Sequence, residues 1–356
     1  MINLLNGLWT LILFLLILGI IVLVHEFGHF LFAKLSHTYV YEFAIGMGKK
    51  LFSFRRKNDE TEYSIRLIPI GGFNQIAGEN GDLEDNDIPK EKMMNHKSFW
   101  QRFLILFAGP GFNFILTFVV LFISALIFGS TTTKAIVGKV GTDYPAYEAG
   151  IREGDTILAI NNKKVSSWDK AIIIIQTNLG KDLDFKIKNS SGEIKNIKVS
   201  PLEEKDSEGN TSYVYGVGKD NTVKRGLGSS LEYAFDKTGS LFQVMIYTVK
   251  SLFTGGVSVN DLSGPVGIYT IVGEQAKGGV ENLLYLLAYL SINVGVINLI
   301  PFPAFDGGRI LFLIIEKIIR KPLNPKIEST VNAIGFMLLM LLMLFVTCHD
   351  IFNLFG

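Results

Sequence analysis

Long apolar runs without charge restrict the fold more than any other feature of this sequence. Leu8–Val24 runs for 17 residues, Phe103–Phe128 for 26 and Leu283–Phe305 for 23, and none of them contains a charged residue. A shorter run, Ala333–Val346, covers 14 residues. A helix that crosses the ~30 Å hydrocarbon core of a bilayer needs about 20 such residues. The sequence therefore predicts a polytopic α-helical membrane protein with about four transmembrane helices, and the fourth run has a buried or interfacial helix as its alternative.

Composition and charge exclude several other classes of protein. Of the 356 residues, 48% are hydrophobic and 19% are charged, and the charged share is below the ~25% of a typical soluble domain. The 34 basic and 33 acidic residues leave a net charge of +1. No basic stripe alternates with aromatic residues, so nucleic acid is not an expected partner. The single cysteine, Cys348, excludes an intramolecular disulfide framework and a cysteine-rich zinc site.

The lysines and arginines next to the apolar runs predict the orientation in the membrane. They are frequent in residues 34–102, between the first and second runs, and in residues 317–326, between the third and fourth. Short cytoplasmic loops carry such an excess of basic residues. We therefore expect both connections in the cytoplasm, and both termini and residues 129–280 on the other side. Residues 1–6 contain no basic residue and no cleavage site follows the first run, which indicates an uncleaved membrane helix.

The first apolar run leads into a motif of the H-E-x-x-H form, His25-Glu26-Phe27-Gly28-His29. On a helix, residues at i and i+4 lie on one face, so both imidazoles can reach one metal ion. Glu26 lies beside them, where it can take a proton from water. An intramembrane charge costs roughly 2.5–3.5 kcal/mol and usually marks a functional site. The alternative is a span that ends at Val24 and leaves three polar residues at the interface.

Two histidines do not complete a catalytic zinc site, which usually has three protein ligands. Asp306 is the only acid between Glu281 and Glu316, and it follows Pro301 and Pro303, which must break a helix. Irregular backbone at membrane depth survives only when it is buried in protein or lines a watery cavity. Asp306 is therefore the candidate third ligand, with a surface turn as the alternative. Three polar residues nearer in the sequence stand at no spacing typical of a zinc ligand: His37, Glu42 and Asp59.

These motifs together resemble a known family. His25–His29 with Asn298–Gly307 is similar to the paired signature of the site-2 protease family, H-E-x-x-H and N-x-x-P-x-P-x-L-D-G, with Phe305 where the family usually has leucine. Ala108–Phe114 is similar to its G-P-x-x-N-F segment, and Ser263–Ile268 resembles its S-G-P-x-x-I element. The arrangement resembles most closely the bacterial regulator-of-sigma-E type of protease.

The resemblance implies a zinc-dependent intramembrane endopeptidase in the bacterial cytoplasmic (inner) membrane. It implies Zn²⁺ held by His25, His29 and Asp306, with Glu26 as the catalytic group and Asn298 as a substrate-binding residue. The implied substrates are the transmembrane segments of single-span proteins, such as anti-sigma factors or signal-peptide remnants, in regulated intramembrane proteolysis.

Residues 131–202 have the composition of a soluble α+β domain. Ala149–Asn161 has the form A-G-x-x-x-G-D-x-I-x-x-I-N, which resembles a bacterial PDZ domain. PDZ domains add a peptide strand along a sheet edge, so a peptide or substrate tail is one expected partner, and a purely steric plug is the alternative. Leu227–Phe253 is predicted as a helix with mixed apolar and charged faces that rests on membrane lipid.

The cytoplasmic connection is predicted to contain a β-hairpin. Phe43–Phe54 and Glu62–Phe73 flank a polar turn, and Tyr63, Ile65 and Leu67 alternate with polar residues as in a half-buried strand. The resemblance implies a re-entrant hairpin that dips into the membrane beside the site, with a substrate-binding edge at Gly71 and Gly72. A soluble cytoplasmic hairpin is the alternative.

The expected organisation in chain order is a first transmembrane helix with H-E-x-x-H at 1–36, a cytoplasmic loop with the hairpin at 37–101, a second transmembrane helix at 102–130, the PDZ-like domain at 131–202, a linker and membrane-surface helix at 203–281, a third transmembrane helix with the N-x-x-P-x-P-x-x-D-G motif at 282–320 and a fourth at 328–348.

Two other functions remain open. A metal-ion transporter would be expected to have an inverted repeat, and none is visible. An inactive PDZ membrane adaptor would be expected to have lost its glutamate, and Glu26 is present.

Overall fold

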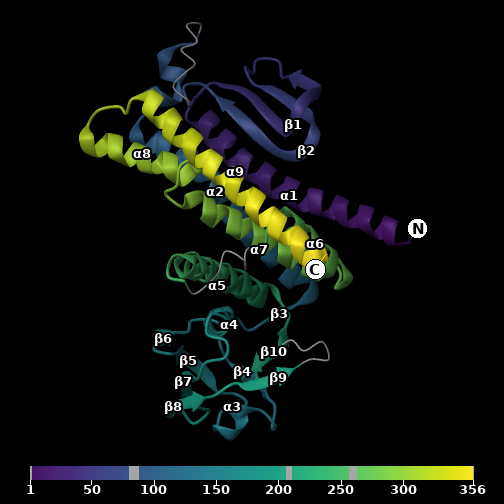
Figure 1. Ribbon diagram of the computed structural model, residues 1–356. Coiled ribbons are helices and arrows are strands. Elements are labelled where there is room, and N and C mark those ends of the chain that lie inside the picture. The colour runs from purple at the N-terminus through teal and green to yellow at the C-terminus, as the bar shows by residue number, and fades with distance from the viewer. Residues whose placement is uncertain (1, 80–87, 206–210, 256–262, 356) are drawn as a thin grey trace. The chain divides into compact units, whose positions relative to one another are not determined.

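The structure is a computed structural model that describes residues 2–79, 88–205, 211–255 and 263–355. The chain divides into two compact units, one formed by residues 1–120 and 262–356 and the other by residues 121–261. Figure 1 shows the helices and strands of both units and labels most of them. The first unit carries the residues of the H-E-x-x-H and aspartate motifs, and the second contains most of the β-structure.

Four helices are long and apolar enough to cross a membrane, in agreement with the predicted polytopic class. They are α1 (Ile2–Leu35), α2 (Phe99–Phe128), α7 (Val280–Leu299) and α9 (Pro325–Phe355). The fourth helix has 31 residues, because polar residues at both ends of the short fourth run continue it. α1 packs against α7 and against the shorter helix α6 (Pro265–Lys277), and α9 packs against α6.

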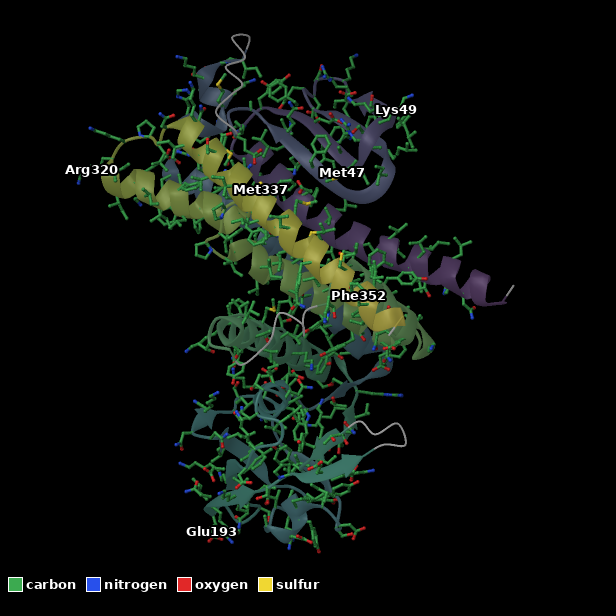
Figure 2. The ribbon with its side chains drawn as sticks, in the orientation of Figure 1. Met47, Lys49, Glu193, Arg320, Met337 and Phe352 are labelled. Atoms are coloured by element: carbon green, nitrogen blue, oxygen red, sulfur yellow. The ribbon has the colours of Figure 1, made fainter. Side chains whose placement is uncertain are left out.

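The outer faces of α1 and α9 expose large apolar side chains. On α9, Met337 is 55% and Phe352 is 76% exposed, and both stand out from the helix in Figure 2. On α1, Trp9 and Leu16 are also more than half exposed. A soluble monomer rarely exposes a contiguous patch of this kind. The pattern is that of helices whose outer faces are covered by lipid.

The third apolar run is interrupted, as the prolines predict. α7 ends at Leu299 and α8 begins at Asp306 and ends at Ile319. Ile300 has extended backbone angles, because the proline that follows it disfavours the helical region. Ala304 takes a φ of +75°, which turns the chain back into α8. The predicted span 282–320 is therefore two helices joined by a short irregular segment.

The predicted hairpin consists of β1 (Val40–Arg55) and β2 (Glu62–Ile76), which are longer than the expected strands. Its register is broken by bulges, and Gly46 and Gly48 there have positive φ. Phe43 lies opposite both Tyr63 and Asn74, so residues 42–45 lie between two segments of β2. The bulges thus fold the hairpin back on itself. The short 3-10 turns η1 (Lys90–Lys92) and η2 (Met94–His96) lead from the hairpin region into α2.

The second unit has an α+β core. A four-stranded sheet has the order β6-β5-β7-β8, formed by Lys163–Lys164, Thr156–Ile160, Leu183–Lys188 and Ile194–Val199. The helix α4 (Trp168–Gln176) begins after Ser167, whose side chain accepts a hydrogen bond from the Lys170 N–H as an N-cap. Phe185 and Ile174 are fully buried in the core. The smaller elements are β4 (Val137–Val140), α3 (Pro145–Glu148), β9 (Leu202–Lys205), β10 (Thr211–Val214) and β11 (Val217–Lys219).

This core extends beyond the boundary expected at residue 202. Tyr215 is buried in it, and β11 pairs with β4. The stretch expected as a polar linker contains the paired strands β9 and β10 instead, which are mostly exposed and therefore lack the apolar alternation of a half-buried strand. Residues 206–210 and 256–262, which also belong to the predicted linker, lie outside the described residues.

Helix α5 (Leu227–Phe253) has two different faces. Lys237 is buried and donates hydrogen bonds of 2.7 and 2.8 Å to Asp169, so one face is bonded to α4. Phe235 and Ile246 on the other face are exposed. The start of α5 is held near the end of α2, because β3 (Ser130–Thr131) pairs with β12 (Val223–Lys224).

Candidate metal centre

The two histidines of the H-E-x-x-H motif lie on one face of α1, as their spacing predicts. Both side chains are buried, and their Nε2 atoms are 3.2 Å apart. His29 Nδ1 is 2.8 Å from the backbone oxygen of Ile105 in α2 and therefore donates its proton to it. This hydrogen bond leaves the Nε2 lone pair of His29 free to bind a metal ion.

Close packing of α1 on α2 depends on small residues at the site. A Cβ atom at Gly109 would lie 2.2 Å from His29 Nε2, and a Cβ atom at Gly28 would lie 2.3 Å from the backbone oxygen of Ala108. Any side chain at either position would push α2 away or displace His29. The glycines of the Ala108–Phe114 segment therefore bring α2 against the histidine pair.

Asp306, the first residue of α8, completes a cluster of three side chains. Its Oδ2 atom is 3.1 Å from His25 Nε2 and 3.4 Å from His29 Nε2. The same Oδ2 atom is buried and accepts no hydrogen bond from the described part of the chain. Within residues 2–79, 88–205, 211–255 and 263–355, this is the one group of three side chains that could hold a metal ion.

The geometry of the cluster fits zinc. A tetrahedral zinc ion with bonds of about 2.0–2.1 Å holds its ligand atoms about 3.3 Å apart. The three ligand atoms here form a triangle with edges of 3.1, 3.2 and 3.4 Å. Two neutral imidazoles and one carboxylate are also the donor set of a hydrolytic zinc site, in which one coordination position stays open. The residues present therefore fit Zn²⁺.

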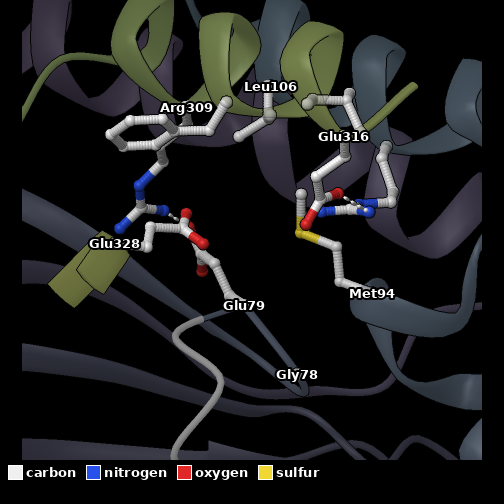
Figure 3. Close-up of a pocket in the computed structure, with 10 residues that line it drawn as sticks. Gly78, Glu79, Met94, Leu106, Arg309, Glu316 and Glu328 are labelled. Carbon is white, nitrogen blue, oxygen red and sulfur yellow. Dashed lines mark hydrogen bonds and ion pairs between the residues drawn. The ribbon is translucent and has the colours of Figure 1, made fainter. Parts of the chain in front are cut away.

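The start of α8 is fixed by backbone packing and by two ion pairs. A Cβ atom at Gly307 would lie 2.3 Å from the backbone oxygen of Ile300. The first turn of α8 therefore packs directly against the irregular segment that follows α7. Figure 3 shows Arg309 joined to Glu79 and, nearby, the carboxylate of Glu316. Glu316 accepts a 2.7 Å hydrogen bond from Arg102 of α2. These pairs hold α8 to the end of β2 and to α2, and thereby fix the position of Asp306.

Glu26 lies next to the cluster and contacts the hairpin. Its Oε2 atom accepts a 2.8 Å hydrogen bond from Asn74 Nδ2 in β2. Gly72 lies against it, because a Cβ atom there would be 3.7 Å from Glu26 Cγ. Gly71 has a φ of +81° and lies against Met47, which turns the strand just before it passes Glu26. The hairpin is therefore in direct contact with the candidate catalytic carboxylate.

The other residues considered in the sequence lie outside the cluster. Asn298 is half-buried near the end of α7 and has no hydrogen bond to the three clustered side chains in the described part of the chain. Glu42 forms an ion pair with Arg66 within the hairpin. Burial raises the pKa of Asp59, but hydrogen bonds from Lys34, Tyr63 and the Thr61 N–H outweigh it and lower that pKa to about 2.

Two asparagines were not predicted as site residues. Asn113 of α2 is fully buried, and its Nδ2 atom is 3.2 Å from the ring Nδ1 of His25. It belongs to the segment that resembles G-P-x-x-N-F, which is the signal that could have found it. Asn74 carries no such motif, and its contact with Glu26 depends on the register of the hairpin.

Helices apolar enough to cross a membrane and a cluster of two histidines and one carboxylate are the features of a membrane-embedded zinc hydrolase. A family model described as peptidase family M50 matches residues 13–342, and the chain belongs to this family. It is 33% identical to the regulator of sigma-W protease RasP of Bacillus subtilis, over 97% of this chain and 99% of that protein. It is 35% and 32% identical to the zinc metalloproteases RasP of Bacillus licheniformis and Oceanobacillus iheyensis, each over 97% of this chain and 99% of the relative. The protein is a zinc metalloprotease of the site-2 protease type, as the motifs predicted.

Proposed function

We propose that this protein cleaves the transmembrane segments of single-span proteins at a zinc site formed by His25, His29 and Asp306. The observation that carries the proposal is the buried triangle of their three ligand atoms, in which His25 and His29 lie within a helix apolar enough to span a membrane. Family membership favours this reading over a metal-ion transporter and over an inactive adaptor. One relative is named a regulator of a sigma factor, which supports anti-sigma factors as one class of substrate.

In this account, the zinc ion, Glu26 and Asn298 each have a different role in peptide hydrolysis. Zinc bound there supplies a Lewis acid that acidifies water and polarises a peptide carbonyl. Glu26 takes the proton from the attacking water as the new C–O bond forms, and gives it to the amine nitrogen as the C–N bond breaks. Asn298, near the broken end of α7, donates a hydrogen bond to the substrate in this account.

The hairpin offers an edge at which a substrate can be held in extended form. Residues 72–75 of β2 pair on one side with residues 42–45, and among the described residues no strand pairs with their other side. A peptide added to such an edge is extended and hydrogen-bonded along its backbone. Gly71 and Gly72 leave the approach to this edge without side chains, beside Glu26. The edge would thus unwind a helical substrate where hydrolysis takes place.

The second unit is proposed to control access. Its α+β core over residues 131–202, continued by β11, is PDZ-like in this account and either binds a peptide tail or blocks large substrates. The exposed apolar face of α5 rests on lipid, because β3 and β12 hold the start of this helix close to the end of α2. The site then receives substrates from within the bilayer of the cytoplasmic membrane.

The function is tested with purified protein in lipid vesicles and a reporter that has one transmembrane helix. We expect zinc-dependent cleavage whose new ends, located by mass spectrometry, fall inside the reporter's apolar segment. A chelator should stop the reaction and added zinc should restore it. Cleavage confined to a soluble tail, or a reaction insensitive to the chelator, would contradict the proposal.

The proposed orientation has a separate test. The native Cys348 is replaced by serine, and single cysteines are then introduced at Asn58 in the hairpin turn and at Glu193 in the second unit, both exposed positions. A membrane-impermeant maleimide added to intact cells should label the cysteine at 193, and the cysteine at 58 only after lysis. The reverse order would overturn the orientation derived from the basic residues.

A further inference from the structure

We infer that Asn74 is a positioning residue that holds the Glu26 carboxylate in its working orientation, an inference that rests on the proposed catalytic role of Glu26. Asn74 Nδ2 donates to Glu26 Oε2 at 2.8 Å and to the Glu26 backbone oxygen at 2.6 Å. Both hydrogens of one amide group thus bond to one residue. This arrangement ties the glutamate side chain to its own backbone through a single partner.

The orientation of the Asn74 amide follows from its partners. Both Glu26 atoms that it contacts are acceptors, so the nitrogen must face them. Asn74 Oδ1 is then turned away, and it is buried with no hydrogen-bond partner among the described residues. A buried polar atom without a partner is unfavourable. The amide therefore gives up one hydrogen bond of its own in order to make two to Glu26.

The hairpin supplies the rigidity that such a clamp needs. Asn74 lies opposite Phe43 in the β1–β2 ladder, and Phe43 is buried against Phe30 of α1 with ring centroids 5.0 Å apart. Gly72, two residues earlier on the same strand, also touches Glu26. A glutamate has several rotamers of similar energy, and one donor on a packed strand selects one of them. Catalytic groups held by such supporting contacts act more efficiently than mobile ones.

The proposed substrate edge and the catalytic carboxylate are linked by this contact. Asn74 belongs to residues 72–75, the segment proposed to receive the substrate strand. Both hydrogen bonds of the Asn74 side chain go to Glu26 in α1. The side chain therefore positions the carboxylate and does not bind the substrate. Loss of the amide should therefore slow turnover and leave substrate affinity and zinc content unchanged.

The test compares purified full-length variants in the reporter assay. Asn74→Ala removes both donors, and Asn74→Asp keeps the shape of the side chain while replacing the donors with a carboxylate that repels Glu26. Each should lower kcat by about 10–100-fold, the usual effect of losing a supporting partner, with KM and zinc per protein unchanged. Asn95→Ala is the matched control, because Asn95 is an exposed amide of η2 that lies outside both the proposed substrate edge and the metal cluster, and its kcat should equal that of the wild type.

Two further variants, Asn74→Ser and Glu26→Gln, distinguish the role of Asn74 from that of Glu26. Asn74→Ser retains one donor and should recover part of the kcat lost in Asn74→Ala. An unchanged kcat in Asn74→Asp, or a loss that appears in KM or in zinc content, would overturn the role of Asn74. Glu26→Gln is measured beside these variants. If it is inactive while Asn74→Asp is fully active, only the inference fails, whereas an active Glu26→Gln protein shows that the proposed role of Glu26 is wrong.

Discussion

Glu26→Gln should abolish cleavage of a reporter helix while leaving about one zinc ion per chain. Glutamine has nearly the same size and accepts a hydrogen bond, but it cannot take a proton from water and return it to the leaving amine. Loss of a general acid–base group typically costs about 10²–10⁴-fold in rate. The measurement is kcat in vesicles together with zinc content by elemental analysis.

The control for this variant is zinc content, because Glu26 is not one of the three clustered ligand atoms. Loss of zinc from the Glu26→Gln protein would show that Glu26 is itself a zinc ligand. A protein that keeps zinc and cleaves at the wild-type rate would leave the site without an identified base.

Asp306→Asn should lose most of its zinc, and activity with it. The carboxylate is the single anionic ligand in the cluster, and its Oδ2 atom lies 3.1 Å from His25 Nε2. A neutral amide is a poor ligand for zinc, so we expect affinity to fall by more than the ~100-fold that loss of a supporting partner costs. The measurement is zinc per protein after dialysis against a buffered low zinc concentration. Asp306→Glu, which keeps the charge, should retain more zinc than Asp306→Asn.

Asp350→Asn is the matched control for Asp306. Asp350 is also a buried acid of the first unit, but its Oδ2 atom accepts a 2.8 Å hydrogen bond from the Gly267 N–H in the first turn of α6. The amide oxygen of asparagine can still accept this hydrogen bond, so Asp350→Asn should change stability little and leave zinc bound. Full zinc occupancy in Asp306→Asn with loss in Asp350→Asn would reverse the assignment.

The sequence was sufficient to predict those contacts within the side-chain cluster that depend on local periodicity. His25 and His29 are one helical turn apart, so any helix there brings them together. Asp306 could be singled out because it is the lone acid of an apolar stretch and follows two prolines. Its approach to the histidines agrees with that reasoning, but it depends on how α8 packs against α2, which no local pattern specifies.

The features that escaped prediction arise from long-range register and packing. Asn74 lies 48 positions from Glu26 in the sequence, and bulges at Gly46 and Gly48 shift the strands in a way that alternation of residues does not reveal. Tyr215 lies beyond a polar stretch, so its return to the α+β core could not be read from composition. The prolines predict the break between α7 and α8, but no local pattern predicts the ion pairs of Arg309 with Glu79 and of Glu316 with Arg102 that bind α8 to its neighbours.

X-ray absorption at the zinc edge of the purified wild-type protein tests the proposed ligand set most directly. His25, His29 and Asp306 predict two imidazoles in the first shell, with nitrogen and oxygen ligands at about 2.0–2.2 Å. The chain has five histidines and one cysteine, so other ligand sets are available to it. A third imidazole, a single imidazole, or a sulfur ligand at about 2.3 Å would contradict the site described here.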